Sequence, residues 1–375
     1  MSARSLSDQL PERLERARQD AERSLEAPFR GISSTEGLAQ GLFPLSRSGV
    51  PTDTLVARAS AYLDSLPDTE RARGQFPVTS DAWRRWSNIH PFFMRHGVSL
   101  EVLDEHQRGL ALDLVASALS EQGYATARDI MRLNETLHEL TGSDAEYGEW
   151  LYWLSILGTP SPSEPWGFQL DGHHLIVNCF VLGDQIVMTP MFLGSEPVHA
   201  TSGRYAGTRV FAEEERAALR LAQALSPEQF GRAQVAVATP GEIFTAAYRD
   251  NLTLEREGIS FGELQAPRQA QLRELIACHI ERIRSGHAEV RIGEIERHLD
   301  ATSFAWMGGN EDDSAFYYRV HSPVVLIEFD HLAGVAFDNE EPTRNHIHSV
   351  VRTPNGNDYG MDLLRQHYEQ AHRAR

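Results

Sequence analysis

Residues 345–359 read Asn-His-Ile-His-Ser-Val-Val-Arg-Thr-Pro-Asn-Gly-Asn-Asp-Tyr. This pattern predicts a short strand, a turn and the start of the last helix. Because side chains alternate across a strand, His346, His348 and Arg352 point to one face and Ile347 points to the other. Two imidazoles on one face can bring two neutral nitrogens within reach of one metal ion. The alternative is a polar sheet face that is open to water.

A second pair of histidines, His173 and His174, precedes a strand over 175–182 in which nearly every residue is apolar. We predict that Asp171-Gly172 makes a hairpin turn just before this pair. Adjacent strand residues face opposite ways, so at most one of the two histidines can join a common site, and the alternation favours His174. The alternative is a pair that hydrogen-bonds to turn carbonyls.

Glu328 is the most informative carboxylate, because four apolar residues precede it and Phe329 follows it. This context predicts burial, and a buried carboxylate requires an arginine, a metal ion or a proton as its partner. Arg319 and Arg352 are the candidate arginines for an ion pair. The functional alternative is a metal ligand or a general base whose pKa lies near neutrality.

Arg319 is predicted to share one strand face with Tyr317 and His321. The planar fork of an arginine can bind a carboxylate or a phosphate through two hydrogen bonds. Arg319 and Arg352 are therefore candidates for holding a negative group of a substrate. Tyr359, which is close in sequence to the His-x-His strand, is a candidate proton donor.

The whole chain predicts an α+β fold with a helical N-terminal third over 1–145. The α+β region over 146–375 contains an antiparallel or mixed sheet, with strands within 146–192 and 303–353 and a helical insert over 211–299. We expect the two regions to form one compact unit. Apolar periodicity and capping residues predict helices at 5–26, 52–66, 99–120, 123–141, 211–225, 263–285, 288–299 and 358–373. No glycine-rich phosphate loop follows a strand, which argues against Rossmann or P-loop nucleotide binding.

Composition limits the classes of partner. The chain has 375 residues, of which 41% are hydrophobic and 23% charged, and a formal net charge of −18. This negative charge argues against a broad nucleic-acid surface and against docking on anionic membranes. Two well-separated cysteines, no recognisable secretory signal and no long apolar run lead us to expect a cytoplasmic protein. The oligomeric state stays open, with a homo-oligomer as one option.

Several segments resemble a bacterial and fungal family known as domain of unknown function 3500. They are the residues 165–175, 316–319, 327–331, 346–348 and 352–360. The resemblance extends from about Phe29 to Tyr368 and carries no activity, fold or cofactor with it. Phe168 and Ala315 stand where we expect Trp and Pro in this family, and neither residue is a candidate ligand.

Together these residues predict a metal-dependent enzyme that acts on a small, anionic organic molecule. His346, His348 and one of His173 and His174 would bind the divalent ion, and Glu328 would complete the ligand set or act as general base. Zinc-dependent hydrolysis is the first expectation, because histidines with one open water position suit zinc. An iron or copper oxygenase, a binding protein without turnover and a metal-free acid–base enzyme are the alternatives.

Overall fold

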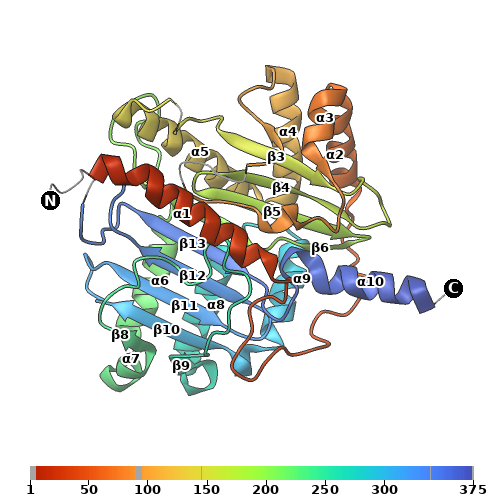
Figure 1. Ribbon diagram of the computed structural model, residues 1–375. Helices are drawn as coiled ribbons and strands as arrows, with labels where there is room; N and C mark the ends of the chain where they lie inside the picture. Colours follow the sequence, from red (N-terminus) through yellow and green to blue (C-terminus); the bar gives the residue numbers. More distant parts are fainter. Residues whose placement is uncertain (1–5, 90–94, 145, 338, 374–375) are drawn as a thin grey trace.

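The computed structural model describes residues 6–89, 95–144, 146–337 and 339–373 (Figure 1). Residue 5, where the first helix is predicted to begin, lies outside this part. The described helices are α1 Leu6–Glu26, α2 Asp53–Ser65, α3 Asp68–Gly74, α4 Glu105–Ala118, α5 Glu121–Thr141, α6 Ala212–Ala224, α7 Pro227–Ala233, α8 Ala266–Ile280, α9 His287–Glu296 and α10 Met361–Arg373. Four short 3-10 helices are η1 Asp81–Arg84, η2 Phe261–Glu263, η3 Leu299–Ala301 and η4 Asp358–Gly360.

One mixed sheet of 13 strands organises the described chain. The strands are β1 Gln75–Phe76, β2 Val98–Ser99, β3 Tyr152–Leu157, β4 Trp166–Gly172, β5 Leu175–Leu182, β6 Gln185–Val187, β7 Met191–Ser195, β8 Gln234–Ala236, β9 Ile259–Ser260, β10 Ser303–Gly308, β11 Phe316–His321, β12 Leu326–His331 and β13 Ile347–Arg352. Their order is β1-β3-β4-β5-β7-β13-β12-β11-β10-β8, with β2, β6 and β9 attached to β3, β5 and β10. The pairs β1·β3 and β8·β10 are parallel, and the other described pairs are antiparallel.

The mixed α+β architecture agrees with the prediction, with differences at particular elements. The N-terminal third is largely helical but also supplies β1 and β2 to the sheet. The helix predicted from residue 99 begins at Glu105, because Ser99 pairs with Trp153 of β3 and Asp104 caps the helix in a capping box with Gln107. The predicted helical insert contributes β8 and β9 to the sheet edge beside β10. The division of the chain into two regions stays a prediction.

The two faces of the sheet differ sharply in polarity. Directly opposed residues on neighbouring strands point to the same face of the sheet. The strand registers therefore show on which face each strand side chain lies. The face that carries His348 also carries the buried polar residues Gln169, Asp171, Asn178, Tyr317, Arg319, His321, Glu328, Asp330 and Arg352. The opposite face carries buried apolar residues such as Leu154, Leu170, Ile327, Phe329 and Val351.

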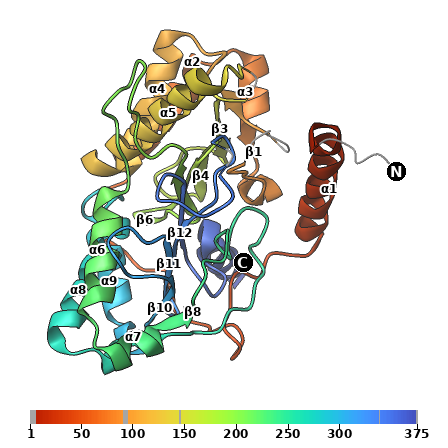
Figure 2. The ribbon, with the colours of Figure 1, turned by 90° about the vertical axis from the view of Figure 1, so that its left-hand side faces the viewer.

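Helices cover the apolar face, and mostly irregular chain covers the polar one. Figure 2 shows α4, α5, α6, α8 and α9 on one side of the sheet and α1 on the other. On the polar side, the segment 237–258 binds the sheet through Glu328, and Trp86 packs against Phe192 with ring centroids 6.0 Å apart. Loop backbone over polar side chains supplies many hydrogen-bond partners, which explains how so many charged residues can be buried there. In the described part of the chain, no helix has the length and apolar character needed to cross a membrane.

Candidate metal centre

His346 and His348 are held by strand β13 and its two neighbours. His348 lies opposite Gly194 of β7 on one side and Asp330 of β12 on the other. His346 lies just before the strand, where its carbonyl accepts the N–H of Leu332 at 2.9 Å. The predicted alternation places both rings on one side, and their Nε2 atoms are 3.2 Å apart.

His173 and His174 form the two-residue turn between β4 and β5. The predicted Asp171-Gly172 turn is wrong, because both residues belong to strand β4, in which Gly172 pairs with Leu175 of β5. His174 has φ +61°, a left-handed conformation that costs a side chain about 1–2 kcal/mol. Its carbonyl accepts the N–H of Gly194 at 2.7 Å, so the strained turn is fixed to β7. Strain maintained at a fixed position is typical of functional sites.

The structure brings three of the four predicted histidine ligands together. His174, His346 and His348 offer nitrogen atoms that all lie within 4.8 Å of one another. Each of the three is only 4–5% exposed. The fourth, His173, stacks on His174 with ring centroids 3.8 Å apart, but its Nδ1 lies 2.8 Å from Asn134 of α5. His173 therefore packs against the ring of His174 and is not part of the cluster. The cluster consists of three imidazoles.

The surroundings fix which nitrogens of His346 and His348 carry protons. Nδ1 of His346 lies 2.7 Å from the carbonyl oxygen of Ala333, which can only accept, so this nitrogen is an N–H donor. Nδ1 of His348 lies 2.8 Å from a carboxylate oxygen of Glu242 and also donates. Burial raises the pKa of Glu242, but His348 and the N–H of Ile243 more than offset this, and the net pKa is below its ordinary value.

When both rings are neutral, this arrangement points two unprotonated Nε2 atoms at each other across 3.2 Å. Two lone pairs at this distance repel unless a cation lies between them, which can be a proton on one ring or a metal ion. A proton bridges two nitrogens, whereas a metal ion also uses the third nitrogen, on His174. Two imidazole ligands of tetrahedral zinc, each about 2.0–2.1 Å from the ion, are roughly 3.3 Å apart. The separation of the two nitrogens thus fits a first-row metal ion.

Burial keeps two of the three rings, those of His174 and His346, in the neutral form that binds a metal ion. Burial lowers the pKa of His174 well below its ordinary value, and the charges of the other three histidines lower it further. Burial, followed by His348, lowers the pKa of His346 to about 3. Histidine binds metal ions only through a neutral nitrogen, so these rings present their lone pairs over a wide pH range.

Gly194 makes room for two of the three rings. A Cβ atom on this residue would lie 3.0 Å from Cδ2 of His348 and 3.1 Å from Cδ2 of His174, and 2.8 Å from the carbonyl oxygen of Ile347. We expect Gly194→Ala to displace both rings and to weaken metal binding by roughly 10–100-fold, the range seen when ligands lose their orientation. Titration of the metal-free protein with Zn²⁺ measures this. The control is Gly109→Ala in α4, where a Cβ meets nothing within 4 Å; equal affinities for the two variants would refute the prediction.

Asp330 is a buried carboxyl group beside the cluster that sequence reasoning did not select. It is fully buried opposite His348, and neither of its oxygens bonds to another side chain among the described residues. Burial raises the pKa of Asp330 to about 9, and the charges of Glu242 and Glu328 contribute. The carboxyl group is therefore neutral at pH 7. Asp330 is two residues from Glu328 in β12, so strand alternation could have placed both carboxyl groups on the same face.

The raised pKa of Asp330 predicts a pH-dependent cost to stability. The folded state keeps the proton up to about pH 9, whereas the unfolded chain releases it near pH 4. Stability is therefore lost as pH rises through this window, by at most about 1.4 kcal/mol per pH unit. For the metal-free proteins, we expect the difference in melting temperature between Asp330→Asn and the wild type to increase in favour of the variant as the pH rises from 5 to 8. Parallel melting curves for the two proteins across this range would contradict the assignment.

Glu328 is buried as predicted, but its partners are backbone and hydroxyl groups. Its carboxylate accepts the N–H groups of Phe244 and Thr245 at 2.8 and 2.9 Å. It also accepts the hydroxyls of Thr245 and Tyr317. No ion pair of Glu328 with Arg319 or with any other cation forms among the described residues. Glu328 thus anchors the segment that carries Glu242, two residues before Phe244.

The two predicted substrate arginines lie on the polar face but already have anionic partners. Nε of Arg352 lies 2.8 Å from Asp358, and both side chains are completely buried. Arg319 pairs with Glu257 at 2.5 Å. Arg352 is four residues along β13 from His348, about 13 Å at the rise of a strand. The structure therefore does not bring these guanidinium groups to the histidines.

Tyr359 lies at the Arg352 end of β13, away from the histidines. Its hydroxyl accepts the indole N–H of Trp86 at 2.9 Å, and burial raises its pKa above the ordinary value. Phe29 packs edge-on against its ring with centroids 5.6 Å apart. These contacts make Tyr359 a packing residue beneath the segment that contains Trp86.

The fold and the site define a mixed α+β protein with a three-histidine candidate metal centre. The chain belongs to the family described as protein of unknown function (DUF3500), which matches residues 48–361. The family predicted from the sequence motifs is thereby confirmed, and the matched region contains all eight residues selected from the sequence. Comparison with curated proteins and with solved structures gave no match.

Proposed function

We propose that this chain is a metal-dependent enzyme whose ion is held by His174, His346 and His348. The proposal is supported above all by the Nε2 atoms of His346 and His348, which face each other at 3.2 Å beside a third imidazole. Three neutral nitrogens with an open fourth position are the ligand set of catalytic zinc, which supplies Lewis-acid chemistry and an activated water. Hydrolysis of a small organic molecule is accordingly our first choice of reaction.

The neighbouring residues have separate roles in this proposal. Glu242 and the carbonyl of Ala333 orient the rings of His348 and His346 through their Nδ1–H groups. Asp330, whose carboxyl group holds a proton at pH 7 in the metal-free protein, is the candidate to give a proton to a leaving group. The general-base role predicted for Glu328 has less support, because four hydrogen bonds already occupy its oxygens.

Substrate entry requires a covering segment to move, because the three histidines are almost fully buried. Residues 333–337 contact His346 through Ala333, and the carboxylate of Glu196 accepts the N–H groups of Val335 and Ala336. An anionic substrate group remains part of the proposal, but it would have to compete with existing ion pairs for Arg319 and Arg352. We place the enzyme in the cytoplasm, without nucleic-acid or membrane partners, and leave a homo-oligomer open.

The experiment that tests the proposal combines metal analysis with turnover. Protein purified without a histidine tag is assayed on a panel of p-nitrophenyl carboxylate and phosphate esters, with and without 1,10-phenanthroline. We expect turnover that is lost in the chelator and restored by Zn²⁺. Restoration by iron or copper together with oxygen consumption would favour an oxygenase instead. Turnover that persists in a chelated, metal-free sample would overturn the proposal in favour of acid–base catalysis, and bound metal without any turnover would favour a binding protein.

Glu242→Gln tests the orienting carboxylate separately. The substitution keeps an oxygen near Nδ1 of His348 but removes the negative charge, so we expect metal affinity to fall by roughly 10-fold. The control is Glu274→Gln, whose side chain is 53% exposed and pairs with Arg220 on the surface. Isothermal titration of both metal-free variants with Zn²⁺ gives the two affinities. If Glu242→Gln binds as tightly as the control, Glu242 has no part in holding the ion.

A further inference from the structure

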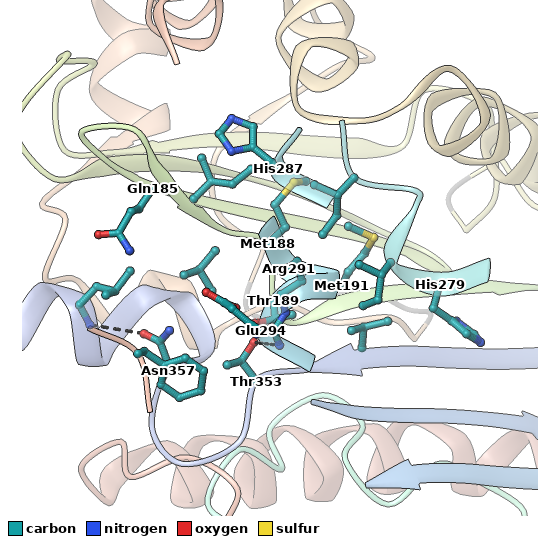
Figure 3. Close-up of a pocket in the computed structure, with 17 residues that line it drawn as sticks. Gln185, Met188, Thr189, Met191, His279, His287, Arg291, Glu294, Thr353 and Asn357 are labelled. Carbon is teal, nitrogen blue, oxygen red and sulfur yellow. Dashed lines mark hydrogen bonds and ion pairs between the residues drawn. The ribbon is translucent and has the colours of Figure 1, made fainter. Parts of the chain in front are cut away.

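A cavity lies on the apolar face of the sheet, on the opposite side from the three histidines. It is bounded by β6, β7 and the end of β13 on one side and by α8 and α9 on the other (Figure 3). Part of its space is open to solvent at the mouth. Val351 lines it, and because strand side chains alternate, Val351 and His348 point to opposite faces of β13. The cavity is therefore separate from the candidate metal centre.

Part of the interior wall of this cavity is apolar. Met188, Met191, Ile280 and Val351 line it and are 1–7% exposed. Figure 3 shows the side chains of Met188 and Met191 near the middle of the cavity. Methionine side chains are flexible and polarisable, so they adapt to apolar guests of different shape. The wall favours an apolar ligand body.

The charged residues at the cavity neutralise each other. Arg291 donates to Glu294 at 2.9 Å, to the carbonyl oxygen of Val324 at 2.6 Å and to the hydroxyl of Thr353 at 3.0 Å. Arg291 and Glu294 are both only partly buried, so they belong to the rim. Because the guanidinium group already has one anion and two oxygen acceptors, it offers little to a second anion. A charged ligand is thus not favoured.

One polar group in the wall has no partner. Nε2 of His287 is buried, and it has no hydrogen bond among the described residues, while the residue as a whole is 5% exposed. Burial lowers the pKa of His287 to about 4, and the charge of Arg284 contributes, so the ring is neutral at pH 7. A neutral imidazole nitrogen without a partner costs free energy unless a hydroxyl, carbonyl or similar group binds it.

We propose that this cavity is a second binding site, which takes a small, uncharged and largely apolar molecule with one hydroxyl or carbonyl group. Its apolar body lies between Met188, Met191 and Ile280, and its polar group bonds to Nε2 of His287. The inference does not depend on the metal centre, because the two sites lie on opposite faces of the sheet and share no residue.

Naphthalene derivatives test the proposal on the full chain. 1-Naphthol is the uncharged ligand with a hydroxyl, naphthalene lacks the hydroxyl, and 1-naphthoate carries a negative charge. We expect saturable binding of 1-naphthol at one site, with naphthalene and 1-naphthoate each roughly 10-fold weaker. Methyl-¹³C methionine spectra locate the site in the wild type: among the 7 methionines, only Met188 and Met191 should shift strongly. Shifts at other methionines alone, or tighter binding of 1-naphthoate, would overturn the proposal.

Substitutions separate the contribution of the apolar wall to ligand binding from that of the polar group on His287. Met191→Trp fills the interior and should reduce 1-naphthol affinity at least 10-fold. Its control is Val102→Trp at a residue that is 68% exposed, which should bind as the wild type does. His287→Leu should bind naphthalene normally and lose the preference for 1-naphthol. If Met191→Trp does not fold, His287→Leu and the wild-type spectra still decide the question, and an unchanged preference in His287→Leu would refute the role of His287.

Discussion

Replacement of both His346 and His348 by alanine should remove the bound ion. Wild-type protein reconstituted with zinc is expected to hold about one ion per chain and the double variant less than about a tenth of that, because one remaining imidazole cannot retain a divalent ion against water. Nε2 atoms 3.2 Å apart make this pair the centre of the site. Elemental analysis of tag-free protein, repeated after reconstitution with iron and copper, measures the content and selects the metal.

The matched control is the double variant His106→Ala/His199→Ala, which removes two exposed histidines. It should retain the metal content of the wild type. Equal metal content in the two double variants would show that the ion binds elsewhere. Absence of metal from the wild type after reconstitution with each ion would leave a proton as the cation between the two rings, and the metal-dependent enzyme would then be rejected.

Arg352→Met should destabilise the fold by about 3–5 kcal/mol, the cost of leaving a buried carboxylate without its cation. Asp358 is completely buried, and besides Arg352 it accepts the N–H of Thr353 at 2.7 Å. Burial raises the pKa of Asp358, and Arg352 opposes that rise. Removal of Arg352 therefore forces a proton onto Asp358 or breaks the turn after β13. Urea denaturation of the variant and the wild type gives the difference in free energy of unfolding.

Two control variants test whether the loss of stability comes from the uncompensated charge of Asp358. Arg352→Met/Asp358→Asn should recover a large part of the loss, because the uncompensated charge is gone. Arg58→Met, which breaks a pair whose side chains are 48% and 52% exposed, should cost less than about 1 kcal/mol. If Arg352→Met were as stable as the wild type but lost affinity for an anionic substrate, Arg352 would be a substrate residue rather than a structural one.

The parts of the fold predicted from the sequence are those that depend on local periodicity. Helices such as α6 and α10, and the strands β10 to β13, follow from apolar spacing, caps and β-branched residues close in sequence. The prediction that His346 and His348 share one face also follows from local alternation. The hairpin turn between β4 and β5 was misplaced by two residues, because the strand pairing extends through Gly172 and forces His174 into the left-handed region.

The remaining site residues could not be predicted, because their partners are distant in sequence. Glu242 lies in a segment that is bound to the sheet by Glu328 and Arg352, both more than 80 residues away, and these contacts bring it to His348. Alternation along β12 could have indicated Asp330, but its lack of a side-chain partner depends on every element around it. The sequence also cannot show that Arg319 and Arg352 are ion-paired, since Glu257 and Asp358 become their partners only on folding.

The sequence by itself determined the family, the α+β class, the burial of Glu328 and the common face of His346 and His348. The family follows from the resemblance of its motifs, and local alternation and apolar spacing are sufficient for the other three. Only the tertiary structure decided that His174 rather than His173 joins the cluster and that the arginines are already paired. The physical reason is that the distances between the histidines are set by the strand order β5-β7-β13-β12, whereas the ion pairs depend on how the segments that carry Glu257 and Asp358 fold onto the sheet.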